Sequence, residues 1–298
     1  MSMHFLAECL ATPWALERGR LYAYASVLAR RYAGGSHEGE ERATPQAASV
    51  RTVGAPRSGS VAVIPVYGAI TQRATMMSMC DGGTSTQSIS NALRQANADE
   101  SVTSIVLDID SPGGSVYGVS ELAAEIRASS KPVTAVANSL AASAAYWLGT
   151  AASEFFVTPG GEVGSIGVWM AHEDWSKAVA EQGVAVTLIS AGKYKVEGNP
   201  YEALTPEARD FMQSRTDDYY GAFTRDVAKG RNVSVDQVRA GMGQGRVLGA
   251  AQAKAENMVD GVMTFDQVIR HVQKSAKAGG GRNATAARQR EVDILSLE

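Results

Sequence analysis

The stretch Ile105-Val-Leu-Asp-Ile-Asp110, which runs into Ser111-Pro-Gly-Gly114 and then into a helical pattern over 116–128, decides the fold. Its first six residues are typical of a buried strand, and the Pro and Gly residues mark a turn. A second strand is predicted over 133–137, followed by a turn and a helix that begins near Ser143. Strands that alternate with helices in this way predict an α/β fold, with a mostly parallel sheet covered by helices.

One domain is predicted over 61–277, starting with the buried strand Val61-Ala-Val-Ile-Pro-Val66. It includes a long helix that starts at Thr205-Pro-Glu and runs to about Lys229. An apolar stripe on this helix indicates a core or oligomer contact and consists of Phe211, Met212, Tyr219, Phe223 and Val227. Outside the domain we predict a helical arm over 1–33 with an amphipathic helix over 16–32, a flexible linker over 34–60 and a disordered tail over 278–298.

Composition agrees with a globular protein. The 298 residues are 45% apolar and 20% charged, enough for one sizeable core with appendages. A net charge of −3 gives no reason to expect a nucleic-acid surface or a basic membrane patch. The two cysteines, Cys9 and Cys80, have no metal-type spacing and suit a reducing compartment.

No membrane segment is expected from the sequence. The first residues lack a basic region, and Glu8 interrupts their apolar run before a signal-peptide core could form. The longest uncharged stretch, 132–153, is rich in Ala, Ser, Gly and Thr and too polar for a spanning helix. We therefore expect a protein inside the cell without a membrane anchor.

Two segments point to nucleophilic catalysis. Ser143 lies among small residues in Asn138-Ser-Leu-Ala-Ala-Ser-Ala-Ala-Tyr-Trp147, where a strand turns into a helix, and Lys195 ends the turn Ser190-Ala-Gly-Lys-Tyr-Lys195. A serine hydroxyl becomes a good nucleophile only when a neighbouring base takes its proton. A lysine can be that base in its neutral form, which burial in an apolar pocket favours. The two segments together predict a serine nucleophile with a lysine base.

Two further segments would complete a site for acyl transfer. Gly113 and Gly114, at the predicted strand-to-helix turn, could offer backbone N–H groups to an oxyanion, with a helix dipole behind them. Ser165, between glycines in Glu162-Val-Gly-Ser-Ile-Gly-Val168, could hydrogen-bond the lysine amine and orient it. Each motif alone is as typical of close helix packing or a solvated turn, so the prediction depends on the ordered set.

Other catalytic arrangements are weaker. A Ser-His-Asp triad needs a histidine, and His172 is the one reasonable candidate among four, although a surface or capping role suits its position better. Asp108 and Asp110 could suggest paired carboxylates, but we assign them to a strand end and a helix cap. The sequence has no phosphate loop or metal cluster, so neither a cofactor nor a metal is predicted.

The ordered motifs resemble the signal peptide peptidase A family of serine-lysine proteases, most specifically over 105–201. The resemblance implies a Clp-protease/crotonase-like core. It also implies that Ser143 is the nucleophile, Lys195 the general base and Ser165 the residue that orients the lysine, with Gly113 and Gly114 as oxyanion candidates. One departure is Ala144-Ala145, where the family usually has two glycines, which narrows the pocket.

A finer resemblance is to the bacteriophage head maturation proteases of this family. It lies in Thr12-Pro-Trp-Ala-Leu16, Met170-Ala-His-Glu-Asp-Trp175, Gln182-Gly-Val-Ala-Val-Thr-Leu-Ile189 and Lys195-Val-Glu-Gly-Asn-Pro-Tyr201. It implies an endopeptidase of capsid assembly whose substrates are scaffold, portal or coat proteins, and which acts as a homo-oligomer in the host cytoplasm, within the procapsid. Three alternatives remain: a host-type peptidase for signal-peptide remnants, a non-catalytic structural head protein with the same fold, and a crotonase-type acyl-CoA enzyme.

Overall fold

The computed structural model describes residues 13–16, 51–53, 59–73 and 83–276. The predicted tail over 278–298, and the predicted helix over 16–32 beyond its first residue, lie outside the described residues. So does Cys80, and so does Cys9.

The main sheet confirms the predicted α/β architecture. Its strand order is β11-β10-β8-β6-β3-β2, and β9 pairs with both β8 and β12. The strands are β2 (Arg51–Val53), β3 (Ser60–Tyr67), β6 (Val102–Ser111), β8 (Val133–Ala142), β9 (Glu154–Val157), β10 (Glu162–Gly164), β11 (Val247–Gly249) and β12 (Gly261–Val262). Every pair in this sheet is parallel except the two edge pairs, β2 with β3 and β10 with β11.

A smaller sheet stands beside the end of β6. Its order is β1-β7-β4-β5, formed by β1 (Trp14–Leu16), β7 (Gly113–Ser115), β4 (Ile70–Thr71) and β5 (Thr84–Ser85). The strand β7 corrects the prediction of a turn at Gly113 and Gly114. The strands β1 and β2 lie inside the segments predicted as a helical arm and a linker, because the backbone groups at a sheet edge draw extended segments into pairing.

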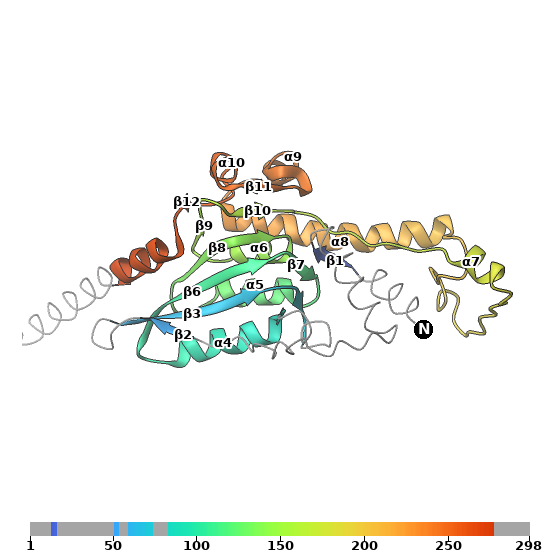
Figure 1. Ribbon diagram of the computed structural model, residues 1–298, viewed down its shortest axis with the longest axis horizontal. Helices are drawn as coiled ribbons and strands as arrows, with labels where there is room; N and C mark the ends of the chain where they lie inside the picture. The colour runs from blue at the N-terminus through green and yellow to red at the C-terminus, as the bar shows by residue number, and fades with distance from the viewer. Residues whose placement is uncertain (1–12, 17–50, 54–58, 74–82, 277–298) are drawn as a thin grey trace, which may run out of the picture.

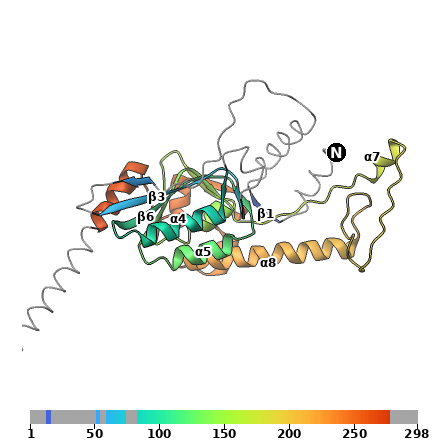
Figure 2. The same ribbon diagram turned by 90° about the horizontal axis from the view of Figure 1, so that it is seen from below.

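Helices cover the sheet. The helices α4 (Thr86–Ala98), α5 (Val119–Arg127), α6 (Ala144–Gly149) and α8 (Pro206–Arg231) lie on one face (Figures 1 and 2). Val268 and Val272, in a helical stretch over 265–276, pack with Val61 and Val106 on the other face. The short elements are α7 (Ser176–Glu181), α9 (Val235–Ala240), η1 (Met242–Gly245) and α10 (Ala250–Ala255). Both faces of the central strands are therefore buried, as expected for parallel strands.

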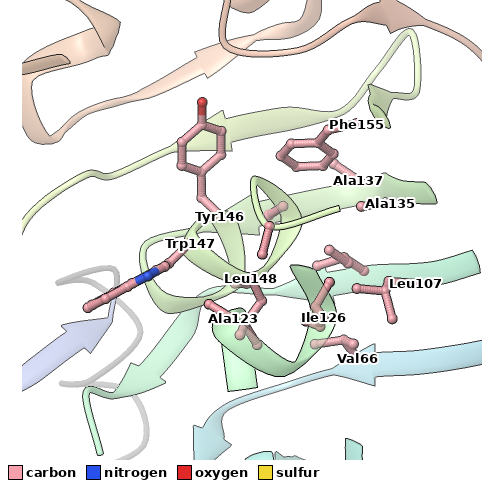
Figure 3. Packing of buried hydrophobic residues seen from close by; sticks show 14 of the residues in the cluster. Val66, Leu107, Ala123, Ile126, Ala135, Ala137, Tyr146, Trp147, Leu148 and Phe155 are labelled. Carbon is pink, nitrogen blue, oxygen red and sulfur yellow. The ribbon is translucent and has the colours of Figure 1, made fainter. Parts of the chain in front are cut away.

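The helix α6 is the centre of the core. Every one of its side chains is buried, and Tyr146, Trp147 and Leu148 pack among residues from the sheet and α5 (Figure 3). The Tyr146 hydroxyl donates a 3.0 Å hydrogen bond to Met258 O, and Trp147 stacks on Phe223 of α8 with ring centroids 4.6 Å apart. The stretch predicted to be too polar for a membrane span thus forms β8, α6 and a turn. Within the described ranges, no helix is long and apolar enough to cross a membrane.

The long helix begins where the sequence predicts, with Thr205 as its N-cap and a proline in the first turn. The residues of its apolar stripe differ in burial. Phe223 and Val227 are buried against the core, whereas Phe211 is 57% exposed. The first half of α8 instead forms an arm with α7 and the segment 182–205, which projects from the sheet (Figures 1 and 2).

Candidate active site

Ser143 occupies a strained position between β8 and α6. Its φ of 56° and ψ of −118° lie in a region that non-glycine residues rarely adopt. Two hydrogen bonds hold this conformation: Ser143 N–H donates to Gly164 O at 2.7 Å, and Trp147 N–H donates to Ser143 O at 2.9 Å. Strain of this kind costs on the order of 1–3 kcal/mol and clusters at functional sites.

The Ser143 hydroxyl has no structural role in the helix that it precedes. Ser143 is the N-cap of α6, yet its side chain makes no capping hydrogen bond. The residue is 1% exposed, and its Oγ lies 3.5 Å from Gly167 O, at the outer limit of a hydrogen bond. A buried hydroxyl that contributes so little to the fold is available for chemistry.

The segment that carries Ser165 wraps around Ser143. Gly164 accepts the Ser143 N–H, and Gly167 O is the near neighbour of the Ser143 hydroxyl. Ser165 lies between them with a φ of 55°, partly buried, and its N–H donates to Arg246 O at 2.8 Å. The structure therefore brings the two predicted serine segments together.

Gly113 lies against Ser143. A Cβ on Gly113 would come within 2.9 Å of Ser143 Cβ and 2.8 Å of Ala142 O, so only glycine allows this approach. The Gly113 N–H donates to Ser111 Oγ at 3.2 Å, whereas Gly114 pairs with Ala15 of β1. The predicted helix dipole behind the two glycines is wrong, because α5 begins only at Val119.

Sequence reasoning missed a second N–H group at this place. Ala144 follows Ser143 as the first residue of α6, and the first N–H groups of a helix have no partner within it. Ala144 and Ala145 are also fully buried, so their methyl groups belong to the core. The signal that could have found this donor is the helix start itself, which the sequence places near Ser143.

Lys195 does not lie beside Ser143 within one chain. It is exposed, and its neighbours Lys193 and Tyr194 both hydrogen-bond Glu207 in the first turn of α8, at 3.3 and 2.8 Å. At the other end of α8, Asp226 accepts a hydrogen bond from Trp147. Glu207 and Asp226 are 19 positions apart on α8, roughly 28 Å at 1.5 Å per residue. The arm therefore holds the lysine far from its predicted partner.

The weaker candidates have other roles. His172 precedes α7 and contacts the arm, where its Nε2 lies 3.0 Å from Asn199 O. Asp108 is not at a strand end: it is buried within β6, where Tyr67 OH donates to it at 2.5 Å and Asn138 Nδ2 at 3.1 Å. Burial raises the pKa of Asp108, although both hydrogen bonds act to lower it. Asp110 follows it as an exposed residue of the same strand and caps no helix.

Neither a metal cluster nor a hollow adds to the site. Among the residues that the structure describes, no three His, Cys, Asp or Glu side chains lie close enough to hold a metal ion. A surface hollow of about 360 Å³ near the helical stretch 265–276 contains none of the predicted site residues. It is lined by Val262, Met263, Gln267, Arg270, His271 and Lys274.

Comparison with known proteins gives two family matches. Residues 125–279, which include Ser143, Ser165 and Lys195, match the model of peptidase family S49. Residues 59–163, which include Gly113 and Gly114, match the Clp protease model, in agreement with the predicted core.

The relatives of this chain include phage and bacterial proteins. The capsid assembly protease C of Escherichia phage lambda is 40% identical over 181 residues, 60% of this chain and 41% of that protein. The head-tail preconnector protein GP5 of Enterobacteria phage P21 is 42% identical over 180 residues, 60% of this chain and 36% of that protein. Protease 4 of Salmonella typhi is 31% identical over 226 residues, 75% of this chain and 36% of that protein. The chain thus matches less than half of each of these relatives.

Proposed function

The chain belongs to peptidase family S49, and we propose that it is a serine endopeptidase in which Ser143 is the nucleophile and Lys195 the general base. The observation that carries the proposal is the geometry of Ser143: a strained backbone, a buried hydroxyl that caps nothing and backbone N–H groups close by. The family match, which includes all three predicted side chains, supports the same assignment.

The base is proposed to come from a second copy of the chain. A lysine acts as a base in its neutral form, which burial favours, and the arm leaves Lys195 exposed. The arm cannot simply fold back, because Tyr194 is tied to Glu207 and the far end of α8 is tied to α6 through Asp226. A neighbouring copy can meet the arm without any such change.

The arm carries a surface that supports this association. Its segment 183–189 forms no strand, yet it exposes a row of apolar side chains, with Ile189 as its most exposed member at 95%. The other members are Val184, Val186 and Leu188. An extended apolar segment that pairs with no strand among the described residues is typical of one that pairs with another chain.

The proposed reaction is acyl transfer through Ser143. Lys195 of the neighbouring copy takes the proton from Ser143 Oγ, which attacks the peptide carbonyl carbon, while the N–H groups of Gly114 and Ala144 stabilise the oxyanion. The lysine then gives the proton to the leaving amine, and a water that the same lysine deprotonates hydrolyses the acyl-enzyme. Ser165 positions the lysine amine.

Capsid assembly is the proposed setting. It rests on the two phage relatives, one named as a capsid assembly protease and the other as a head-tail preconnector protein. The substrates would be scaffold, portal or coat proteins, and the place of action would be the procapsid in the host cytoplasm. The domain over 61–277 would carry the protease activity.

Complementation tests the dyad and its assembly together. Ser143→Ala and Lys195→Ala variants with different tags are each expected to leave a phage head substrate uncut. When the two are co-expressed, about one site in four combines the intact serine of the Lys195→Ala variant with the intact lysine of the Ser143→Ala variant, because each interface joins unlike surfaces of two copies. Activity near a quarter of wild type is expected. Activity in either variant alone would remove that residue from the mechanism.

A non-catalytic head protein is the second candidate, favoured by the exposed position of Lys195 in a single chain. It predicts no cleavage by wild type and no labelling of Ser143 by a serine-reactive phosphonate. The protease predicts labelling that Ser143→Ala abolishes, together with the complementation described above.

A further inference from the structure

The short strand β1 crosses the candidate active site. On one side, Trp14, Ala15 and Leu16 pair antiparallel with Ser115, Gly114 and Gly113 of β7. On the other side, Trp14 N–H donates to Trp169 O at 3.0 Å, and Trp169 N–H donates to Trp14 O at 3.1 Å. The segment is therefore hydrogen-bonded between β7 and the stretch that follows Ser165.

The orientation of this strand places a peptide carbonyl beside the nucleophile. Trp14 directs both of its backbone groups to Trp169, and successive residues of a strand alternate, so Ala15 directs its own towards β7. Ala15 O lies 2.2 Å, and Ser143 Cβ 2.9 Å, from the position that a Cβ on Gly113 would take. Those two atoms are thus no more than about 5 Å apart, so the Ala15 carbonyl lies beside the side chain of the candidate nucleophile.

The groove also fits the side chains of this segment. Ala15 is 0% exposed and belongs to the main core cluster, so its place accepts a methyl group and has no room for a long side chain. Trp14 is 5% exposed. An extended peptide that adds to a sheet edge and fills side-chain pockets is one of the general modes of peptide recognition.

We propose that the segment Pro13–Leu16 is a ligand of the chain's own peptide groove, bound as a substrate would be, with Ala15 at the residue that precedes the attacked bond. Another peptide can enter only after this segment leaves. The inference rests on the proposed function for the identity of the groove. It adds to that function an internal competitor and a preference for a small side chain next to the attacked bond.

A binding experiment tests this without requiring activity. In full-length chain with Ser143→Ala, we would measure anisotropy of a fluorescein-labelled peptide, Thr-Pro-Trp-Ala-Leu-Glu. Adding Ala15→Arg displaces the internal strand, because its buried place cannot hold the longer side chain, and is expected to increase affinity at least tenfold. Thr52→Arg, which adds the same charge to the exposed strand β2, is the matched control and should have no effect. A peptide with Arg in place of its Ala should bind neither protein.

A reversible disulfide that fixes this segment in the groove provides a second test if Ala15→Arg fails to fold. Trp14 and Ser115 lie directly opposite in the antiparallel pair, where Cα separations suit a disulfide. In the Ser143→Ala chain without Cys9 and Cys80, Trp14→Cys with Ser115→Cys should bind the peptide when reduced and lose at least tenfold in affinity when oxidised.

Equal affinity in the locked and open forms would overturn the proposal, as would equal binding by the Ala15→Arg and Thr52→Arg chains. Absence of proteolysis in the complementation experiment would instead overturn the proposed function. The binding results could still be interpreted in that case, because they do not depend on activity.

Discussion

Trp147 Nε1 donates a 2.7 Å hydrogen bond to Asp226 Oδ2, and this contact ties α6, the helix that follows Ser143, to the part of α8 from which the arm projects. Arg127 of α5 donates to the other carboxylate oxygen at 2.7 Å. One carboxylate on α8 therefore holds two helices of the core. The same contact fixes the direction in which the first half of α8, and with it Lys195, leaves the body.

Removing this carboxylate should destabilise the protein. Asp226→Ala leaves the mostly buried Arg127 without its partner and the Trp147 N–H without an acceptor. Losing one member of a buried pair costs about 3–5 kcal/mol. The control is Asp218→Ala, whose partner Arg215 is exposed and whose loss should cost no more than about 1 kcal/mol. Urea denaturation measures both, and equal costs would contradict the prediction.

The sequence predicted the elements with a clear period. The segments 105–110 and 133–137 are mostly apolar runs, and Thr205 followed by Pro206 is a helix start signal; the structure has β6, β8 and α8 there. The place of Ser143 followed from the same reasoning, since a strand and a helix adjoin at that residue.

Other parts could not be predicted because no local pattern encodes them. The three-residue strand β7 exists through pairing with segments far away in the chain, including Trp14–Leu16. The arm depends on which half of α8 finds a core to pack against, and Phe211 and Phe223 look alike in sequence. For this reason the sequence did not predict that Lys195 and Ser143 lie far apart within one chain.

The exposed apolar row on the arm should control assembly. Ile189→Glu places a charge in the proposed contact between copies and is expected to give monomers, measured by light scattering, with loss of proteolysis. Because Ile189 is 95% exposed, the free energy of unfolding of a single chain should change by no more than about 0.5 kcal/mol. Val262→Glu, an exposed apolar residue on β12, should leave assembly unchanged. Intact oligomers in Ile189→Glu would contradict the role of the arm.

Asp260 should make the fold sensitive to acid. Burial raises the pKa of Asp260, but hydrogen bonds from Arg231 and from Phe155 N–H outweigh it and hold that pKa below its usual range. The native state therefore gains stability above the unfolded pKa of about 3.9 and loses it as the pH falls through the lower native value. The stability gap between wild type and Asp260→Asn should narrow from pH 5 to pH 2. A gap that stays the same from pH 5 to pH 2 would contradict this role of Asp260.

Asp108 should make the stability depend on pH in the opposite direction. Burial raises its pKa, so the native state holds the proton more tightly than the unfolded chain does. Stability is then greatest below the unfolded pKa of about 3.9 and falls as the pH rises through the raised native value. Asp108→Asn keeps an acceptor for Tyr67 OH and does not titrate. As the pH rises from 3 to 7, the unfolding free energy of this variant should therefore increase relative to that of wild type. A constant difference across that range would contradict the prediction.

Gly230 should be irreplaceable where α8 passes the end of α6. A Cβ at Gly230 would lie 1.9 Å from Thr150 O, a backbone atom that cannot move without shifting α6. Gly230→Ala should therefore cost at least about 1–3 kcal/mol, as overpacking does, even though alanine is the better helix former. Gly221, on the same helix, would meet only the flexible guanidinium of Arg225 at 3.1 Å. Gly221→Ala should be neutral or stabilising by up to about 1 kcal/mol, and equal costs in thermal denaturation would exclude close packing as the cause.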